Sequence, residues 1–138
     1  MSNKWLGEEG KSYKFFWRGG NDGLSGVGVL VAEKWVENVI EVKKLSKRIM
    51  LIRVAIGTNI LNVISCYAPQ IGRPTVEKEE FLLSLSKIVD EIGQEEFVVI
   101  GGDMNGHVGE KVAGSEEVRG EGYGVKNTEG EMLLELMR

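Results

Sequence analysis

The first hundred residues are dominated by apolar runs with the spacing of β-strands. Strands are expected over six segments: residues 13–17, 26–31, 40–45, 49–56, 60–66 and 97–100. The first, which is aromatic, is expected at a sheet edge. Gly57-Thr58-Asn59 has the composition of a hairpin turn, which favours antiparallel pairing of its flanking strands. The last segment has four apolar residues in a row, which predicts one of the most buried strands.

From residue 75 to 92 the apolar spacing changes to that of a helix. Phe81, Leu85, Ile88 and Ile92 fall on one helical face, and acidic residues such as Glu77 occupy the first turn. A glycine-rich loop is expected over 106–124, followed by a second helix opened by the capping-box pattern that begins at Thr128. The mixture predicts an α/β fold.

Length and composition set the broad class of protein. The chain has 138 residues, a mass of 15.3 kDa and a 42% hydrophobic share, which suits one domain with its own core. No linker, repeat or membrane-length apolar run is present in the sequence, and no signal peptide is expected. The single cysteine, Cys66, excludes an internal disulfide. We therefore expect a soluble intracellular protein, nuclear or cytoplasmic.

The charge balance limits the possible partners without deciding among them. A net charge of −4 and a pI near 5.2 argue against a strong non-specific nucleic-acid binder. They do not exclude a metal-dependent nuclease, whose site is itself acidic. The basic residues concentrate at Lys43, Lys44, Lys47 and Arg48. This run is either a solvated turn or a contact to a phosphate backbone.

Residues 97–105 carry the clearest candidate chemistry. The apolar run ends in Gly101-Gly102, and Asp103 and Asn105 follow at the carboxyl end of the expected strand. Alternate residues of an extended segment point the same way, so both side chains can face one site. A carboxylate suits Mg²⁺ or Mn²⁺, and an amide can orient a water molecule or a phosphate oxygen. Alternatively, both side chains satisfy backbone groups of a loop.

Several short motifs in a fixed order resemble a known family. They are Lys34-Trp35, Arg48-Ile49-Met50, Asn62-Val63-Ile64-Ser65, Tyr67-Ala68-Pro69-Gln70 and Gly101-Gly102-Asp103-Met104-Asn105-Gly106-His107-Val108-Gly109. Together they resemble the endonuclease/exonuclease/phosphatase superfamily, and within it the endonuclease domain of RTE-type LINE retrotransposons, which craniofacial development protein 2-like proteins also carry. The resemblance runs from about Trp5 to the end of the sequence. It implies a deoxyribonuclease-like fold, in which two β-sheets form a sandwich flanked by helices.

The resemblance also implies an activity and assigns residues to it. The reaction is hydrolysis of a DNA phosphodiester by metal-activated water. Asp103 would bind the metal and activate the water, Asn105 would hold the water or the phosphate, and the Tyr67 hydroxyl would contact the scissile phosphate. His107 either contacts phosphate in the groove or is a loop histidine without a catalytic role.

Two expected parts of the family's site have no counterpart in the sequence. The metal-binding glutamate of an early strand falls about where Ser2 stands, and the Asp-His pair that follows later in the family is absent. Residues 1–138 are therefore expected to be a partial domain, incomplete at both ends. Such a fragment would bind Mg²⁺ or Mn²⁺ weakly if at all, and we expect it to be inactive alone. The alternatives are a non-catalytic binding remnant and, less favoured by the motifs, an inositol or lipid phosphatase relative.

Overall fold

The computed structural model describes residues 2–19 and 26–105 of the chain. The chain divides into two compact units. Unit 1 comprises Met1–Tyr67 and Lys87–Asp103, and unit 2 comprises Ala68–Ser86 and Met104–Arg138. The expected glycine-rich loop over 106–124 and the helix from Thr128 lie outside the described residues. Within the described ranges, no helix has the length and apolar character needed to cross a membrane.

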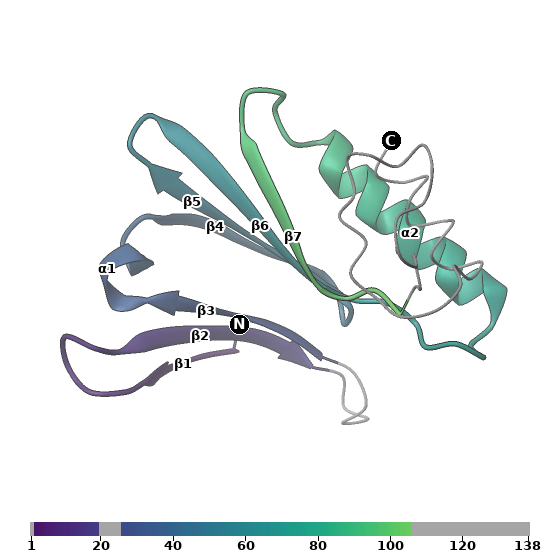
Figure 1. Ribbon diagram of the computed structural model, residues 1–138, viewed down its shortest axis with the longest axis horizontal. Helices are drawn as coiled ribbons and strands as arrows, with labels where there is room; N and C mark the ends of the chain where they lie inside the picture. Colours follow the sequence, from purple (N-terminus) through teal and green to yellow (C-terminus); the bar gives the residue numbers. More distant parts are fainter. Residues whose placement is uncertain (1, 20–25, 106–138) are drawn as a thin grey trace, which may run out of the picture. The chain divides into compact units, whose positions relative to one another are not determined.

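Unit 1 begins with a three-stranded antiparallel sheet. Its strands are β1 (Ser2–Leu6), β2 (Tyr13–Gly19) and β3 (Gly26–Ala32), in that spatial order (Figure 1). The aromatic segment 13–17 was predicted at a sheet edge, and this was wrong. The segment belongs to β2, which pairs with β1 along one side and with β3 along the other. β1 is exposed at every position, so it has no buried face from which its alternation could be recognised. A single helical turn, α1 (Glu33–Val36), follows β3.

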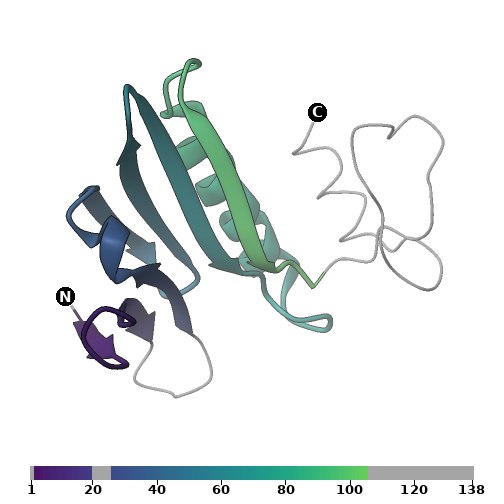
Figure 2. The same cartoon turned by 60° about the vertical axis from the view of Figure 1, so that its left-hand side comes forward.

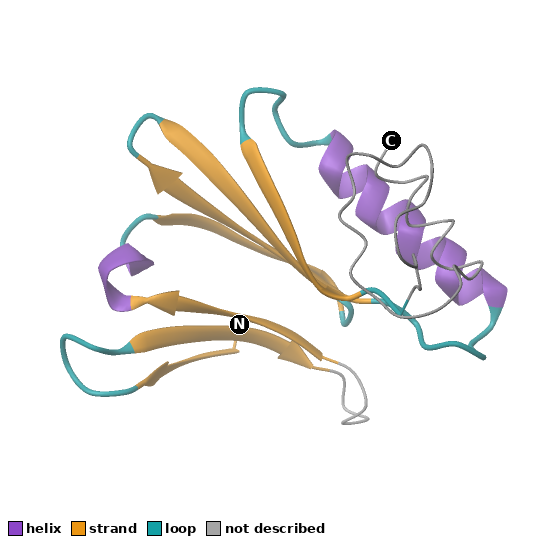
Figure 3. Cartoon of the chain, viewed as in Figure 1, coloured by secondary structure: helices purple, strands orange, loops and turns teal. Residues whose placement is uncertain are grey.

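The second sheet has four strands in the order of the chain. They are β4 (Val39–Ser46), β5 (Ile49–Ile56), β6 (Asn59–Tyr67) and β7 (Phe97–Asp103). The first three are antiparallel, with Gly57 at a φ of 60° in the hairpin turn between β5 and β6. β7 is parallel to β6 and is reached through α2 (Thr75–Asp90), coloured purple in Figure 3. These elements confirm the predicted strands and the first predicted helix to within a few residues at their ends.

One hydrophobic core cluster of unit 1 lies between the two sheets. It contains Phe16, Val27 and Val31 from the three-stranded sheet, and it also contains Met50, Ile52 and Val54 from β5. Because alternate residues of a strand point to opposite faces, Leu51 and Arg53 lie on the other face of β5. The structure therefore shows an α/β protein with two β-sheets, as the sequence predicted at this coarser level.

The predicted burial of residues 97–100 was wrong. Phe97 is 60% exposed and Val99 is 52% exposed. β7 is the edge strand of its sheet, where β6 is its neighbour among the described strands (green in Figure 2). A continuous apolar run is typical of a strand buried on both faces. In this chain the same run belongs to a strand whose position in the sheet leaves it exposed.

Candidate functional site

The structure brings Tyr67 and Asp103 side by side. They are register partners at the carboxyl ends of the parallel strands β6 and β7. Residues in register on neighbouring strands point to the same face of a sheet. Tyr67 packs against the core cluster between the sheets and is half-buried, whereas Asp103 is exposed. A phenol and a carboxylate thus share one face at the rim of the core.

A glycine makes the approach of β7 to β6 possible. Gly102 has a φ of 146°, and a Cβ atom at this position would lie 1.8 Å from the carbonyl oxygen of Cys66. No side chain fits there, so the residue before Asp103 must be glycine. At Gly101, by contrast, no atom lies within 4 Å of an added Cβ. The sequence shows two glycines here, but the backbone requires glycine only at position 102.

Arg48 is the basic side chain that the structure places on Tyr67. Its Nη1 donates a hydrogen bond of 3.2 Å to the Tyr67 carbonyl oxygen, and its guanidinium carbon lies 5.4 Å from the centre of the Tyr67 ring. This is the geometry of a cation–π contact. The tight turn between β4 and β5 fixes the backbone here, because the Arg48 amide donates to Ser46 Oγ at 3.1 Å. Sequence analysis placed Arg48 in a basic run and did not connect it with Tyr67.

Asn105, in unit 2, has a local structural role. Its Nδ2 donates a hydrogen bond of 2.7 Å to the carbonyl oxygen of Ala68, and its backbone is left-handed, with a φ of 46°. Asparagine tolerates this conformation better than most residues. The amide thus satisfies a backbone group, as the alternative interpretation expected, and the water- or phosphate-binding role remains a prediction. The other candidate phosphate contact, His107, lies outside the described residues.

The acidic side chains of the described residues are not grouped as metal ligands. Within residues 2–19 and 26–105, no group of three or more histidine, cysteine, aspartate or glutamate side chains is placed to hold a metal ion. Glu33 has a structural role: its Oε2 accepts hydrogen bonds from Ser12 Oγ at 2.8 Å and from the Gly10 amide at 2.9 Å. The hydrogen bond from the Ser12 side chain is the main reason why the pKa of Glu33 is lowered. Glu33 therefore ties the turn between β1 and β2 to the start of α1.

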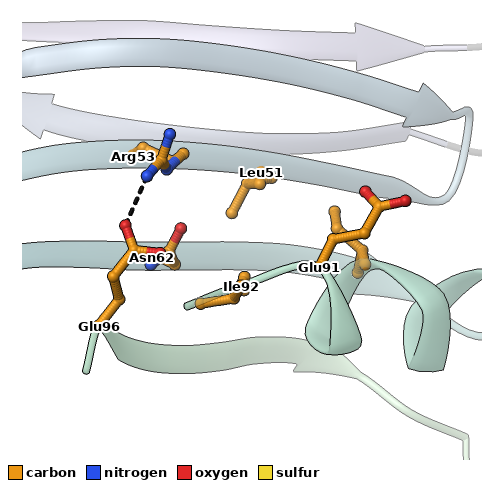
Figure 4. A pocket seen from close by; sticks show the side chains of 7 residues that line it. Leu51, Arg53, Asn62, Glu91, Ile92 and Glu96 are labelled. Atoms are coloured by element: carbon orange, nitrogen blue, oxygen red, sulfur yellow. Dashed lines mark hydrogen bonds and ion pairs between the residues drawn. The ribbon is translucent and has the colours of Figure 1, made fainter. Parts of the chain in front are cut away.

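A pocket of about 100 Å³ lies on the face of the four-stranded sheet opposite the core (Figure 4). Asn62 is fully buried there; its Nδ2 donates to the Phe97 carbonyl oxygen at 3.2 Å, and its Oδ1 has no hydrogen-bond partner among the described residues. Arg53 pairs with Glu96 and with Glu41 beside it. Sequence analysis did not predict this pocket, although an asparagine inside an apolar run could have pointed to it. The lining residues are Leu51, Arg53, Asn62, Ile88, Glu91, Ile92 and Glu96.

The chain matches no protein-family model, and no curated protein matches its sequence. Its chemistry is therefore inferred from the residues themselves. A carboxylate can accept a proton from water, a phenol can donate a hydrogen bond to an ester oxygen, and a guanidinium can bind an anion. Asp103, Tyr67 and Arg48 bring these three groups to one end of unit 1. This set of groups suits an ester of phosphoric acid better than a neutral substrate.

Proposed function

We propose that the chain carries the central part of a phosphodiester-hydrolysing site of the DNA endonuclease type. The observation that supports this most strongly is the register pairing of Tyr67 with Asp103 at the carboxyl ends of two parallel strands. The motifs that contain these residues, Tyr-Ala-Pro and Gly-Asp-Met-Asn, resemble those of the endonuclease/exonuclease/phosphatase superfamily. The proposal includes the finer fold assignment, a deoxyribonuclease-like sandwich, and an intracellular location where DNA is available.

Each residue has a separate task in the proposed reaction. The Asp103 carboxylate orients a water molecule and accepts its proton as the water attacks phosphorus. The ester P–O bond opposite the water breaks, and the leaving oxygen takes a proton from solvent. The Tyr67 hydroxyl donates a hydrogen bond to a non-bridging phosphate oxygen, which gains charge in the transition state. The resemblance also gives Asn105 the task of holding the water or the phosphate.

The residue types at this site fit a hard divalent cation only in part. Mg²⁺ prefers oxygen ligands and is usually bound by one or two carboxylates together with substrate phosphates and water. Asp103 supplies one such carboxylate, and no cluster of further ligands surrounds it among the described residues. When bound with substrate, Mg²⁺ or Mn²⁺ would neutralise charge on the phosphate. We therefore expect metal binding to be weak unless a phosphodiester is present.

Plasmid nicking in the presence of Mg²⁺ or Mn²⁺ tests the proposal. The resemblance assigns the site a second carboxylate and an Asp-His pair that the 138 residues do not supply. We therefore expect no nicking above background by this chain alone. A version extended by a strand carrying a glutamate and by a segment carrying an Asp-His pair should nick. Asp103→Ala should lower its rate by about 10²-fold or more, as loss of a group in a catalytic set commonly does.

A control variant distinguishes the loss of a catalytic group from the general loss of a negative charge. Asp90 is an aspartate at the end of α2, and Asp90→Ala removes the same charge away from the Tyr67–Asp103 pair. This variant should leave nicking unchanged. An extended version that does not nick, or that nicks equally well after Asp103→Ala, would contradict the proposal. Nicking by the 138-residue chain that is lost in Asp103→Ala would support the function and would show that the expected inactivity was wrong.

A further inference from the structure

Asn62 brings a polar atom without a partner to the pocket of Figure 4. It is the register partner of Arg53, so both side chains point to the face of the four-stranded sheet that carries the pocket. Its Nδ2 faces the Phe97 carbonyl oxygen, which can only accept a hydrogen bond, and this fixes which end of the amide is nitrogen. Oδ1 is the other end, and it has no partner among the described residues.

The walls of the pocket do not supply a donor to this oxygen. Arg53 directs its Nη1 to Glu41 and its Nη2 to Glu96. Leu51, Ile88 and Ile92, which line the rest of the pocket, have apolar side chains. A buried carbonyl oxygen without a hydrogen bond is unfavourable, because its bond to water has been lost and not replaced. The donor to Asn62 Oδ1 must therefore be a water molecule or a ligand.

The charges around the pocket favour a cation as that ligand. Arg53 pairs with Glu96 and Glu41, and Lys43 Nζ lies 3.9 Å from a Glu41 carboxylate oxygen. The hydrogen bond from Arg53 is the main reason why the pKa of Glu96 is lowered, so this carboxylate is ionised at neutral pH. Glu91 lines the pocket, and its carboxylate forms no ion pair within the described part of the chain. Two cations thus face three carboxylates, which leaves one negative charge.

The end of α2 adds to this preference. Glu91 directly follows Asp90, the last residue of the helix. The final carbonyl groups of a helix carry partial negative charge and interact favourably with cations. Lys87 lies one turn earlier, but it is exposed and forms no ion pair with Glu91. The negative charge on this side of the pocket is therefore not neutralised by the helix itself.

The size and walls of the pocket limit the ligand further. Its volume of about 100 Å³ is smaller than the roughly 150 Å³ that accommodates the six carbons of benzene, so about four or five non-hydrogen atoms fit. Leu51 and Ile88 are almost fully buried, and Ile92 is half-buried. They offer apolar surface to a short hydrocarbon stem. Because Asn62 has no exposed surface, the ligand must displace Ile92, the most exposed of the three, to reach Oδ1.

We propose that this pocket binds a primary ammonium group on a short hydrocarbon stem. An ammonium group has three N–H donors and no acceptor, so it can donate to Asn62 Oδ1 while Glu91 balances its charge. The stem packs against Leu51, Ile88 and Ile92. A neutral alcohol would satisfy the oxygen but not the negative charge, and a quaternary ammonium would satisfy the charge but not the oxygen.

The pocket is separate from the proposed phosphodiester site. Asn62 and Tyr67 are an odd number of residues apart on β6, so their side chains point to opposite faces of the sheet. All seven lining residues belong to unit 1. Binding of an amine therefore goes beyond the proposed function and does not depend on it.

NMR titration of the nitrogen-15-labelled chain with n-butylammonium chloride at pH 7 tests the proposal. The side-chain amide of Asn62 and the backbone amides of Leu51 and Ile92 should shift saturably, with a dissociation constant on the order of 1 mM. n-Butanol should bind at least about tenfold more weakly. Tetramethylammonium should leave the Asn62 side-chain amide unshifted. Equal binding of n-butylammonium and n-butanol, or shifts confined to other residues, would overturn the proposal and leave water as the donor to Oδ1.

Three variants separate the pocket from the general charge of the protein. Asn62→Leu removes the acceptor at similar size and should weaken binding at least about tenfold. Glu91→Gln removes the charge at an exposed position and should weaken it about threefold. Glu95→Gln is the matched control, because Glu95 is exposed nearby and does not line the pocket; it should leave binding within about twofold. If Asn62→Leu does not fold, an equal effect of Glu91→Gln and Glu95→Gln still refutes the site.

A second probe identifies the source of the ammonium group, which occurs both in free amines and at the end of a lysine side chain. Nα-acetyl-lysine N-methylamide presents the lysine side chain with its flanking peptide groups. Tighter binding of this probe than of n-butylammonium assigns the pocket to a lysine of a partner protein, and weaker binding assigns it to a free amine. Binding of neither refutes the proposal. None of these measurements involves DNA, so their failure leaves the proposed function standing, and a failure to nick DNA leaves the amine site standing.

Discussion

Replacing Gly102 with alanine is the sharpest test of how the fold positions Asp103. The added Cβ atom would lie 1.8 Å from the carbonyl oxygen of Cys66 and 2.8 Å from its carbonyl carbon. Both are backbone atoms, so no side-chain rotation can relieve the clash. β7 must move away from β6 by more than about 1 Å to restore an ordinary contact distance. Gly101→Ala is the matched control, because it adds the same methyl group to open space.

The cost of Gly102→Ala can be estimated from two contributions. Placing a side chain at a φ of 146° costs about 1–2 kcal/mol. Moving the end of β7 also weakens one or two strand hydrogen bonds, each worth about 1 kcal/mol. The free energy of unfolding should fall by about 3 kcal/mol, which lowers the midpoint by about 10 °C. Gly101→Ala should change the free energy by less than about 1 kcal/mol.

Thermal unfolding followed by circular dichroism measures both variants, and hydrogen exchange locates the change. The amides of β6 and β7 near residues 66 and 102 should exchange faster in Gly102→Ala, whereas those of β2 should not. In the extended version that nicks DNA, Gly102→Ala should lower the rate because Asp103 moves with β7. A midpoint within about 2 °C of the original protein would refute the reasoning, as would an equal effect of Gly101→Ala.

Two further predictions concern single titratable groups. Burial raises the pKa of the Cys66 thiol from 9.0 to about 11, so at pH 8 iodoacetamide should alkylate the folded protein at least about a hundredfold more slowly than a free thiol. Mass spectrometry checks this, and modification at the free-thiol rate would contradict it. Because the pKa of Glu33 is lowered on folding, its stabilising effect is present above the unfolded value of 4.5 and is lost as pH falls through the folded value. Glu33→Gln should therefore lower the melting temperature at pH 6 and matter less as the pH falls below the unfolded value of 4.5, and an effect independent of pH would refute this role.

Local sequence patterns were sufficient for most of the secondary structure. Residues 49–56 and 60–66 are apolar runs rich in β-branched side chains, and the structure has β5 and β6 there. β1 could not be predicted in this way, since none of its residues is buried. The order of strands within a sheet depends on long-range pairing, which a local pattern does not contain. The same limit explains why β7 was expected in the interior and lies at an edge.

The candidate site was predictable in its parts and not in its assembly. Asp103 and Tyr67 were each recognised at the end of an apolar strand, one after a glycine pair and one before Ala68-Pro69. Their pairing depends on the crossover through α2 that makes β7 the parallel neighbour of β6. Arg48 illustrates the same point, because only the antiparallel pairing of β5 with β6 brings it to Tyr67. Motifs thus identify chemical groups, and sheet register decides which of them meet.

The two halves of the candidate site are anchored to different extents. Tyr67 belongs to β6, which has β5 on one side and β7 on the other, and its ring packs against the core cluster. Asp103 ends an exposed edge strand whose described neighbour is β6. Local stability is lower where a segment has fewer buried contacts. The phenol is therefore held by more of the fold than the carboxylate, so we expect changes in β7 to displace Asp103 before they displace Tyr67.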